Sequence, residues 1–330
     1  MRNKKQANNW AGQAIAALTL TLLVASSAWA AESYPAKPIR FIVPFGAGGP
    51  GDAIGRMVGR KMAEGLAQPV IIDNRSGATT IIGTEMAAKS LPDGYTMLLI
   101  STTHSVNPSL FNKLPYDPIK DFSPVTMLAN TPFMLVVHPS VPAKSVSELV
   151  ALARSKPGQL NYGSSGNGSS IHLTTELLKS AAKIEMGHVP YKGSGPAFTD
   201  LIGGHIQLLF SSSVSSLPHV KSGKVRSIAI TSAKRVAALP DLPALAETYP
   251  GFEASSWFGL MVPAKTPKAI LERILSEART ALQSSEVNHA LVSQGAAPGG
   301  NSPAEFGDFY QTEMKKWAGV IKSAGIRLDQ

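Results

Sequence analysis

The sequence predicts an α/β protein of two lobes, and three observations support that fold class. Short apolar runs typical of buried strands alternate with segments whose apolar residues recur at helical spacing. Roughly 300 residues follow a leader-like start, which is more than a single core usually serves. Two proline-containing stretches, around Thr131–Pro132 and over 249–259, fit crossings between two lobes.

The first lobe is expected to open with strand and helix units in alternation. Strands are predicted at 38–45, 69–74 and 95–101, because each is a short apolar run bounded by turn residues. Helices are predicted at 54–66 and 81–88, where the apolar residues return every three or four positions. A glycine-rich loop separates the first strand from the first helix.

The remaining chain continues the alternation. The predicted strands are 134–138, 160–165, 206–212 and 225–231. The predicted helices are 147–155, with Ser145 or Ser147 as its cap, and 169–182, 196–202, 267–284, 285–294 and 303–324. With both crossings in place, the first lobe would hold 31–131 and 256–330, and 132–255 would be a second lobe inserted into it.

The start of the chain has the pattern of a secretory signal peptide over residues 1–30. Three basic residues precede an apolar run from Ala14 to Val24, and Ala28-Trp29-Ala30 is a small-x-small cleavage pattern. An uncleaved membrane anchor is the alternative, but the run is shorter than the ~20 apolar residues that a span needs. We therefore expect cleavage near Ala30 and a periplasmic location.

Composition excludes several kinds of site. The chain has no cysteine, so disulfides, zinc thiolates and cysteine nucleophiles are excluded. The formal net charge of +9 is only partly due to the leader, and the excess favours anionic ligands. Its basic residues are scattered rather than clustered, which argues against nucleic acid as a partner.

The first glycine-rich loop matches the spacing of a dinucleotide-binding loop through Gly46, Gly48 and Gly51. Asp73 follows at a distance that suits a ribose contact, so an exported dinucleotide enzyme is one hypothesis. Pro50 and the absence of a visible second nucleotide-binding half argue against it. Backbone N–H groups before a helix bind any small anion, a carboxylate included. Asp52 is expected at the helix cap, and a plain tight turn remains the simplest alternative.

A second loop of the same kind lies in LNYGSSGNGSSIHL, Leu160 to Leu173. It follows a predicted strand and opens a predicted helix, and its serine hydroxyls add donors to those of the backbone. A flexible linker is the alternative for such a glycine and serine run. Two anion-binding loops, one in each lobe, predict a ligand with a carboxylate at each end.

No residue set has the pattern of a nucleophile, a base and an orienting group. No G-x-S-x-G motif is present, and the S-x-x-K match at 180–183 lacks its companion motifs. His172 and Glu176 lie one helical turn apart, but no third metal ligand is evident. An exported serine hydrolase that uses Ser164 or Ser165 remains the alternative enzyme hypothesis. No cofactor and no metal are expected.

Five segments together resemble a known family. They are PIRFIVPFGAGGPGD, VIIDNRSGATTIIG, STTHSVNPSLF, YGSSGNGSSIHLTTELL and HVPYKGSGPAFTDLIGGHIQLLF. With these motifs the chain resembles the solute-binding receptors of the tripartite tricarboxylate transporters, the Bug family, over essentially its whole mature length.

The resemblance implies a type II periplasmic binding protein, in which two α/β lobes are joined by two crossovers with a ligand cleft between them. It implies capture of a di-, tri- or aromatic carboxylate, transient contact with membrane transporter subunits, a monomer and no enzymatic activity. The positions that match the family's motifs and are expected at the ligand are Phe45, Gly46, Ala47, Gly48, Asp52, Thr102, Thr103, His104, Ser164, Ser165, Gly168, Ser169, His172, Pro190 and Tyr191.

The chain departs from the family pattern in two places. Ser211, Ser212 and Ser213 stand where members often carry an acidic residue, which favours a purely anionic ligand over an amino acid. Thr79 and Thr80 stand where glycines are common, so they restrict the backbone and can add hydroxyl contacts. Ser211 and Thr79 are therefore further expected ligand contacts.

Overall fold

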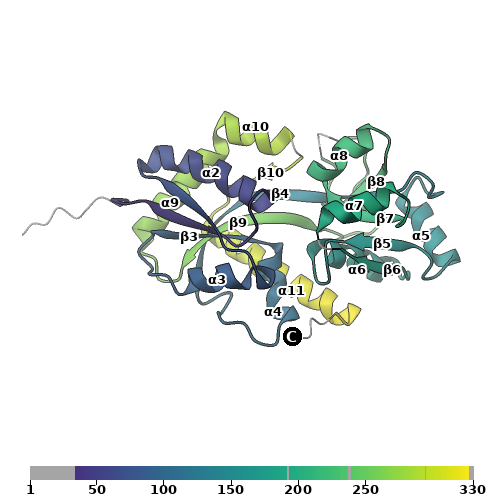
Figure 1. Cartoon of the computed structure of the whole chain (residues 1–330), viewed down its shortest axis with the longest axis horizontal. Coiled ribbons are helices and arrows are strands. Elements are labelled where there is room, and N and C mark those ends of the chain that lie inside the picture. The colour runs from purple at the N-terminus through teal and green to yellow at the C-terminus, as the bar shows by residue number, and fades with distance from the viewer. Residues whose placement is uncertain (1–33, 192, 237–238, 294, 327–330) are drawn as a thin grey trace, which may run out of the picture.

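A computed structural model describes residues 34–191, 193–236, 239–293 and 295–326 (Figure 1). The predicted signal peptide, 1–30, lies outside the described residues. Within the described part of the chain, no helix is both long and apolar enough to cross a membrane. The elements form two groups, and two long strands pass between the groups in the middle of Figure 1.

The first group surrounds a sheet with the strand order β2-β1-β3-β9-β4. Parallel pairing joins the first three of these strands, and β9 enters antiparallel to both of its neighbours. The short strand β10 adds to β4. Their bounds are β1 (Ile39–Val43), β2 (Val70–Asn74), β3 (Thr96–Ser101), β9 (Ser255–Pro263), β4 (Phe122–Val137) and β10 (Ala297–Pro298).

Both faces of this first sheet are covered by helices. Successive residues of β1 point to opposite faces of the sheet, and both faces are buried. Phe41 belongs to the core under α2 and α9, and Ile42 belongs to the core on the other face. Trp257 and Phe306 fill that other face, where α3 and α11 pack. The helices of this group are α2 (Pro50–Leu66), the 3-10 turn η1 (Ala78–Thr80), α3 (Ile81–Ala88), α4 (Thr102–Leu110), α9 (Lys268–Gln283), α10 (Ser285–Ser293) and α11 (Pro303–Ala324).

The second group surrounds the order β4-β7-β5-β6, with β8 also paired to β4. A continuous core that includes Leu135, Tyr162 and Phe210 holds it together. Its strands are β5 (Asn161–Ser164), β6 (Gly187–Pro190), β7 (Leu208–Ser212) and β8 (Arg226–Ile230). Its helices are α5 (Val146–Ser155), α6 (Ser170–Ala182), α7 (Ser194–Ile202), α8 (Ser213–Lys221) and the 3-10 turn η2 (Leu245–Glu247).

Strand β4 belongs to both sheets. It pairs with β9 from Phe122 to Pro132, and from Phe133 onward it pairs with β7 and β8. The sequence predicted only 134–138 as strand and missed the first half. Pro124 and Pro132 cause the error, because proline normally marks an edge, a bulge or a strand end. Here the register shifts just after Pro124, and Pro132 is the last residue to pair with β9.

Helices α4 and α11 contact both cores. Val106 and Leu110 of α4, and Trp317 and Ile321 near the end of α11, lie in the second core, although both helices start in the first group. The sequence assigned 256–330 to the first lobe alone. In the structure, the last turns of α11 also pack beside α6 of the second group. The sequence did not predict α4, α8, β6 or β9.

Candidate functional site

The two glycine-rich loops occupy equivalent places in the two sheets. The first loop (Phe45–Gly49) leads from β1 to α2, and the second loop (Ser165–Ser169) leads from β5 to α6. Each follows the carboxyl end of a parallel strand, where open α/β sheets bind their ligands. Both helices also present the unpaired N–H groups of their first turn there.

The backbone of the first loop is exposed. A Cβ atom added to Gly46 or Gly48 would meet nothing within 4 Å, and Gly48 has φ +81°. Among the residues that the structure describes, no protein group accepts a hydrogen bond from the N–H of Gly46, Ala47 or Gly49. The loop therefore offers backbone donors and the positive end of the α2 dipole to a small anion.

Asp52 fixes the shape of the first loop. Its buried carboxylate accepts hydrogen bonds from Gly48 N at 2.8 Å, from Arg56 Nε at 3.0 Å and from Asn74 Nδ2 at 2.9 Å. These bonds, that of Arg56 first, lower the pKa of Asp52 to about 2. The cap prediction was wrong, since Gly49 is the N-cap and Asp52 reaches back from the first turn of α2. Asp52 thus supports the loop and takes up the Gly48 N–H.

Sequence reasoning missed two residues of this support, Arg56 and Asn74. Arg56 Nη2 donates to Asn74 Oδ1 at 2.9 Å, and Asn74 Nδ2 also donates to the carbonyl of Phe45 at 3.1 Å. The parallel register that places Val43 opposite Asn74 brings β2 beside the loop. The spacing of Asp52 and Arg56, four residues apart on one helix face, was the available signal.

Phe45 forms an apolar wall beside the first loop. Its half-buried ring packs edge-on against Phe258, with centroids 6.2 Å apart. A Cβ atom on Gly51 would lie 2.8 Å from the Phe45 ring, so this glycine is required by the close approach of the side chain.

The turn that holds Thr79 is backbone-strained. Ala78, Thr79 and Thr80 have φ values of +44°, +53° and +75°, in the left-handed region that favours glycine. Asn107 Nδ2 of α4 donates to the Thr79 carbonyl at 2.8 Å and holds the turn in place. The Thr79 side chain is exposed, whereas Thr80 is buried.

Thr102, Thr103 and His104, the three expected residues at the start of α4, differ in burial and in hydrogen bonding. The buried Thr102 hydroxyl donates to the Ser255 carbonyl at 3.1 Å and ties α4 to β9. Thr103 is half-buried, and its N–H donates to Ser101 Oγ, the N-cap of the helix. Of the three expected residues at the start of α4, only Thr103 therefore keeps a partly exposed side chain.

His104 lies in the interior, away from both loops. Its ring stacks on Tyr116 and contacts Phe122 and Tyr310, with centroids 5.5 to 5.6 Å away. Neither ring nitrogen has a hydrogen-bond partner among the described residues, and burial lowers the pKa of His104 to about 3. Because the aromatic cluster encloses the ring, this imidazole is not exposed to a ligand in the structure.

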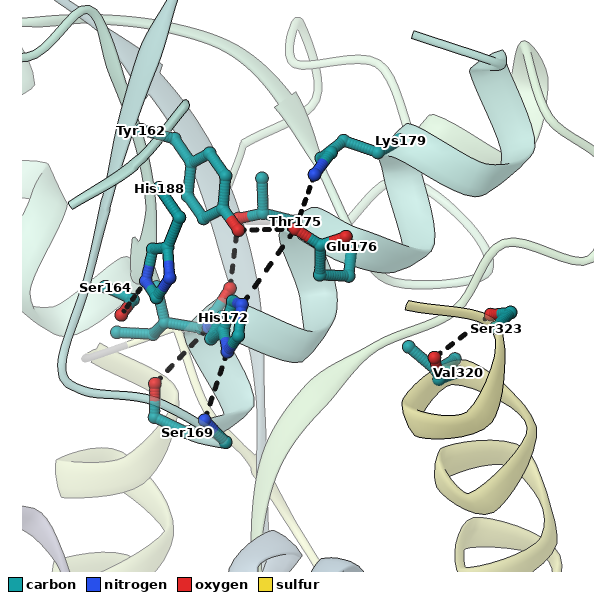
Figure 2. A network of polar contacts seen from close by, with 12 residues as sticks. Tyr162, Ser164, Ser169, His172, Thr175, Glu176, Lys179, His188, Val320 and Ser323 are labelled. Atoms are coloured by element: carbon teal, nitrogen blue, oxygen red, sulfur yellow. Dashed lines mark hydrogen bonds and ion pairs between the residues drawn. The ribbon is translucent and has the colours of Figure 1, made fainter. Parts of the chain in front are cut away.

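The second loop is held by side chains of β5, β6 and α6 that pack against it, as Figure 2 shows. Ser164, at the end of β5, is buried, and its Oγ lies 2.6 Å from His188 Nε2. Gly168 N donates to His172 Nδ1 at 3.0 Å, and Ser169 Oγ caps α6 by accepting from His172 N. Ser165 is half-buried, and its carbonyl accepts from Gly193 N at 3.3 Å. His188 is a residue that sequence reasoning missed.

The remaining expected residues lie around the second loop. Tyr191 N donates to the Ser164 carbonyl at 3.1 Å, which places Tyr191 against the end of β5. The Tyr191 hydroxyl donates to Asp200 Oδ2 at 2.6 Å, and burial together with Asp200 raises the pKa of Tyr191 to about 12. Pro190 is exposed, while Ser211 is buried in β7 opposite Met134.

Ser164 and His188 form a pair of a kind that hydrolases use, but the surroundings do not suit a nucleophile. The Ser164 hydroxyl is fully buried and is also 3.1 Å from the Gly166 carbonyl. Within the described residues, no carboxylate bonds to the His188 ring to orient it, and no three metal-ligating side chains come together.

Two surface hollows lie away from both glycine-rich loops. The larger, about 520 Å³, is lined by residues between Pro108 and Pro118. The smaller, about 320 Å³, lies between α6 and α11 and is lined by Glu176, Lys179 and Ser323 among others. Neither includes a residue of the first or the second loop.

Comparison with known proteins gives the family. Residues 54–326 match the family model of the tripartite tricarboxylate transporter family receptor. The chain belongs to this family. Its members are solute-binding receptors of the periplasm and not enzymes, so the hydrolase and dinucleotide-enzyme hypotheses are wrong.

Individual relatives agree with this assignment. Protein BugT of Bordetella pertussis is 40% identical over 303 residues, which are 90% of this chain and 92% of BugT. The solved structure of R. palustris Rpa4515 with adipate is 36% identical with a TM-score of 0.79, and it covers 89% of this chain and 100% of that chain. MatC from Rhodopseudomonas palustris with bound malate is 31% identical with a TM-score of 0.74, and it covers 87% and 100%.

Proposed function

We propose that this chain is an extracytoplasmic receptor that binds a small carboxylate between its two lobes and passes it to a membrane transporter. The observation that carries the proposal is the first loop, where exposed N–H groups with no acceptor among the described residues precede α2. The Asp52 network holds these donors in place before the ligand arrives, which lowers the entropic cost of binding.

The ligand class that fits best is an acyclic dicarboxylate. A second loop of the same architecture lies in the other sheet. The N–H groups of Gly166, Gly168 and Ser169 bond within the protein there, so the half-buried Ser165 is proposed as the donor to a second carboxylate. Relatives solved with adipate and malate bind ligands of this class. No acidic side chain follows β7, where Ser212 and Ser213 stand instead, so the chain offers no partner there for an amino group.

The proposed site separates ligand contacts from supporting residues. Asp52, Ser164 and His172 are buried and support the loops, whereas Thr102, His104 and Ser211 are buried elsewhere in the two groups. Gly168 is also buried and donates its N–H to His172, so it joins the supporting residues. The residues left as proposed contacts are Phe45, Gly46, Ala47, Gly48, Thr79, Thr103, Ser165, Ser169, Pro190 and Tyr191.

Capture is proposed to close one lobe on the other. The lobes are 31–131 with 256–330, and 132–255, and the hinge lies where β4 changes partners at Pro132 and where β9 begins. Closure would shift the population toward the state in which both loops contact one ligand. Small-angle scattering with and without ligand would measure it as a decrease in the radius of gyration.

Export through a cleaved leader is proposed to bring the receptor to the periplasm as a monomer. Amino-terminal sequencing of protein recovered from the periplasm would test this directly. We expect the mature chain to begin at Ala31, and a mature protein that retains residues 1–30 would contradict the proposal.

The first experiment on binding is a thermal-shift screen of the mature protein, stripped of bound ligand. The panel holds C4 to C8 dicarboxylates, citrate, aromatic carboxylates and acidic amino acids. A ligand that binds only the folded state raises the melting temperature by mass action. A selective shift with dicarboxylates supports the proposal, and silence across the panel rejects it.

A matched pair of variants then locates the site by calorimetry. Ala47→Glu places a carboxylate beside the open donors, and Ala47→Gln adds the same bulk without charge. Repulsion in a partly solvated site predicts an affinity loss of about tenfold or more for the Glu variant over the Gln variant. Equal affinities of the two variants would place the anion elsewhere.

A further inference from the structure

Two histidines from different elements meet face to face below the second loop. The ring centroids of His172 on α6 and His188 on β6 are 3.9 Å apart, with an angle of 10° between the planes. The ring of Tyr162 of β5 lies beside this pair, with its centroid 4.8 Å from that of His188 and 6.2 Å from that of His172. Parallel pairing of β5 with β6, which puts Tyr162 opposite His188, creates this stack (Figure 2).

Each imidazole holds one end of the second loop. At the far end, His172 Nδ1 accepts the N–H of Gly168, a buried glycine at φ +71°. At the near end, His188 Nε2 bonds Ser164 Oγ, and this oxygen also accepts the N–H of Gly166 at 3.1 Å. The loop backbone between Ser164 and Gly168 is thereby fixed at two points by side chains from below.

The hydrogen bond from Gly168 indicates the protonation state of His172. Because Gly168 N–H donates to His172 Nδ1, that nitrogen carries a lone pair, and a neutral ring has its proton on Nε2. Protonation of His172 would remove this acceptor. Charging both rings would also set two positive charges face to face, with the His172 ring buried and the His188 ring half-buried.

The charged groups around the two rings do not reverse the preference for uncharged imidazoles. Glu176 on α6 lies 3.9 Å from His172 Nε2, but its Oε1 already accepts from the Tyr162 hydroxyl at 2.5 Å and from Lys179 Nζ at 2.8 Å. Burial, followed by His188, lowers the pKa of His172 to about 4, and burial lowers the pKa of His188. Both rings are therefore neutral at physiological pH.

We propose that His172 and His188 are positioning residues, which hold the second loop in its ligand-binding shape as a pair of uncharged, stacked imidazoles. The ligand part of this proposal rests on the proposed carboxylate-receptor function. The proposal itself concerns how the loop is held, and it assigns no direct ligand contact to either ring.

The test compares two kinds of replacement at each histidine. His172→Asn keeps an acceptor at the δ position for Gly168, and His188→Gln keeps a polar group at the ε position for Ser164. His172→Phe and His188→Phe keep a flat stacked ring but remove the polar atoms. His219→Gln is the control, because its ring stacks on Phe198 in the same lobe, apart from the loop.

Positioning predicts that the two Phe variants lose about threefold to tenfold in affinity for the dicarboxylate found by the panel, the range expected for one lost hydrogen bond. The Asn and Gln variants should stay within about twofold of wild type, as should the control. A purely structural stack predicts the reverse order, with the Phe variants unaffected, and that result would overturn the proposal. Thermal unfolding of each variant confirms that it is folded.

A second measurement needs no ligand. In NMR spectra of the labelled protein, with the ring signals assigned from the variants, both imidazoles should be neutral at pH 7 and titrate below 6.5. The Gly168 amide signal should move with the His172 titration. Ring titrations near pH 6.5 with a Gly168 amide that does not follow them would overturn the proposal even if dicarboxylates bind. Confirmed loop coupling without dicarboxylate binding would instead reject the proposed function alone.

Discussion

The first and second loops have the same strand-loop-helix architecture but are held by different chemistry. A carboxylate that stays ionised holds the first loop, since the pKa of Asp52 is lowered to about 2. Two neutral imidazoles hold the second loop. Between pH 4 and 7 the first support does not change its charge, whereas the second does. The support of the first loop is thus insensitive to acid over this range, and that of the second loop is sensitive.

The largest effect is expected from removing the support of the first loop. Asp52→Ala leaves the N–H groups of Gly48 and Asn74 without their acceptor, which should lower the free energy of unfolding by about 2–3 kcal/mol. The stabilisation by Asp52 is complete above its ordinary pKa of 3.8 and is lost as the pH falls toward 2. Urea unfolding should therefore give the same loss at pH 5 and pH 8.

Asp73→Ala is the matched control for that change. Asp73 of the edge strand β2 pairs with Arg40 of β1 and with Arg75, which follows β2, and both arginines are partly exposed. Exposed pairs contribute about 0–1 kcal/mol, so a smaller loss is expected. Equal losses in the two variants would show that Asp52 has no special role in the first loop.

The second loop should contribute to the acid sensitivity of the whole protein. The pKa of His172 falls from its ordinary 6.5 to about 4 on folding, so its contribution is complete above pH 6.5 and is lost as the pH drops to 4. Between pH 7 and 4 the wild type should lose about 1–3 kcal/mol more than His172→Asn. Parallel pH profiles of the two proteins would refute this difference.

His104→Phe tests how much of the protein's loss of stability in acid comes from His104 rather than from the second loop. Both ring nitrogens of His104 lack partners, so an apolar ring should change stability at pH 7.5 by no more than about 1 kcal/mol. The low pKa of His104, about 3, means that the variant should also lose less stability in acid. Calorimetry of ligand binding should give an unchanged affinity, and a large loss would return His104 to the site.

The smallest change in the free energy of unfolding is expected near the first loop, and this change is an increase. Thr79→Gly removes the left-handed strain at an exposed residue and should raise the free energy of unfolding by about 0.5–1 kcal/mol. Thr312→Gly, at an exposed position inside α11, should instead lower it by about 0.5 kcal/mol. Chemical denaturation of both variants checks the signs, and a loss in both would mean that Thr79 is unstrained.

Sequence reasoning recovered the local pattern and missed what depends on pairing between distant strands. Periodic apolar residues and glycine positions were enough to predict β1, the first loop and α2. The long β4 was divided because Pro124 and Pro132 resemble strand ends. A register shift accommodates Pro124, and a change of partner strand accommodates Pro132. Nothing in the neighbouring sequence of either proline indicates this.

The same limit explains the errors at the site. Asn74 reaches the first loop only through the register of β1 with β2, and His188 reaches His172 only through the register of β5 with β6. His104 lies in a polar segment near expected contacts, and its burial depends on Tyr116 and Tyr310, which come from other parts of the chain. A motif places a backbone loop well, but it does not say which side chains lie beneath it.

The sharing of β4 between the two sheets has a consequence for how the molecule unfolds. A strand that pairs with β9 in its first half and with β7 and β8 in its second half cannot leave one sheet without disturbing the other. Helices α4 and α11, which contact both cores, add to this linkage. We therefore expect the two groups of elements to unfold as one cooperative unit, and cutting the chain at Pro132 would leave two fragments that each lack half of a central strand.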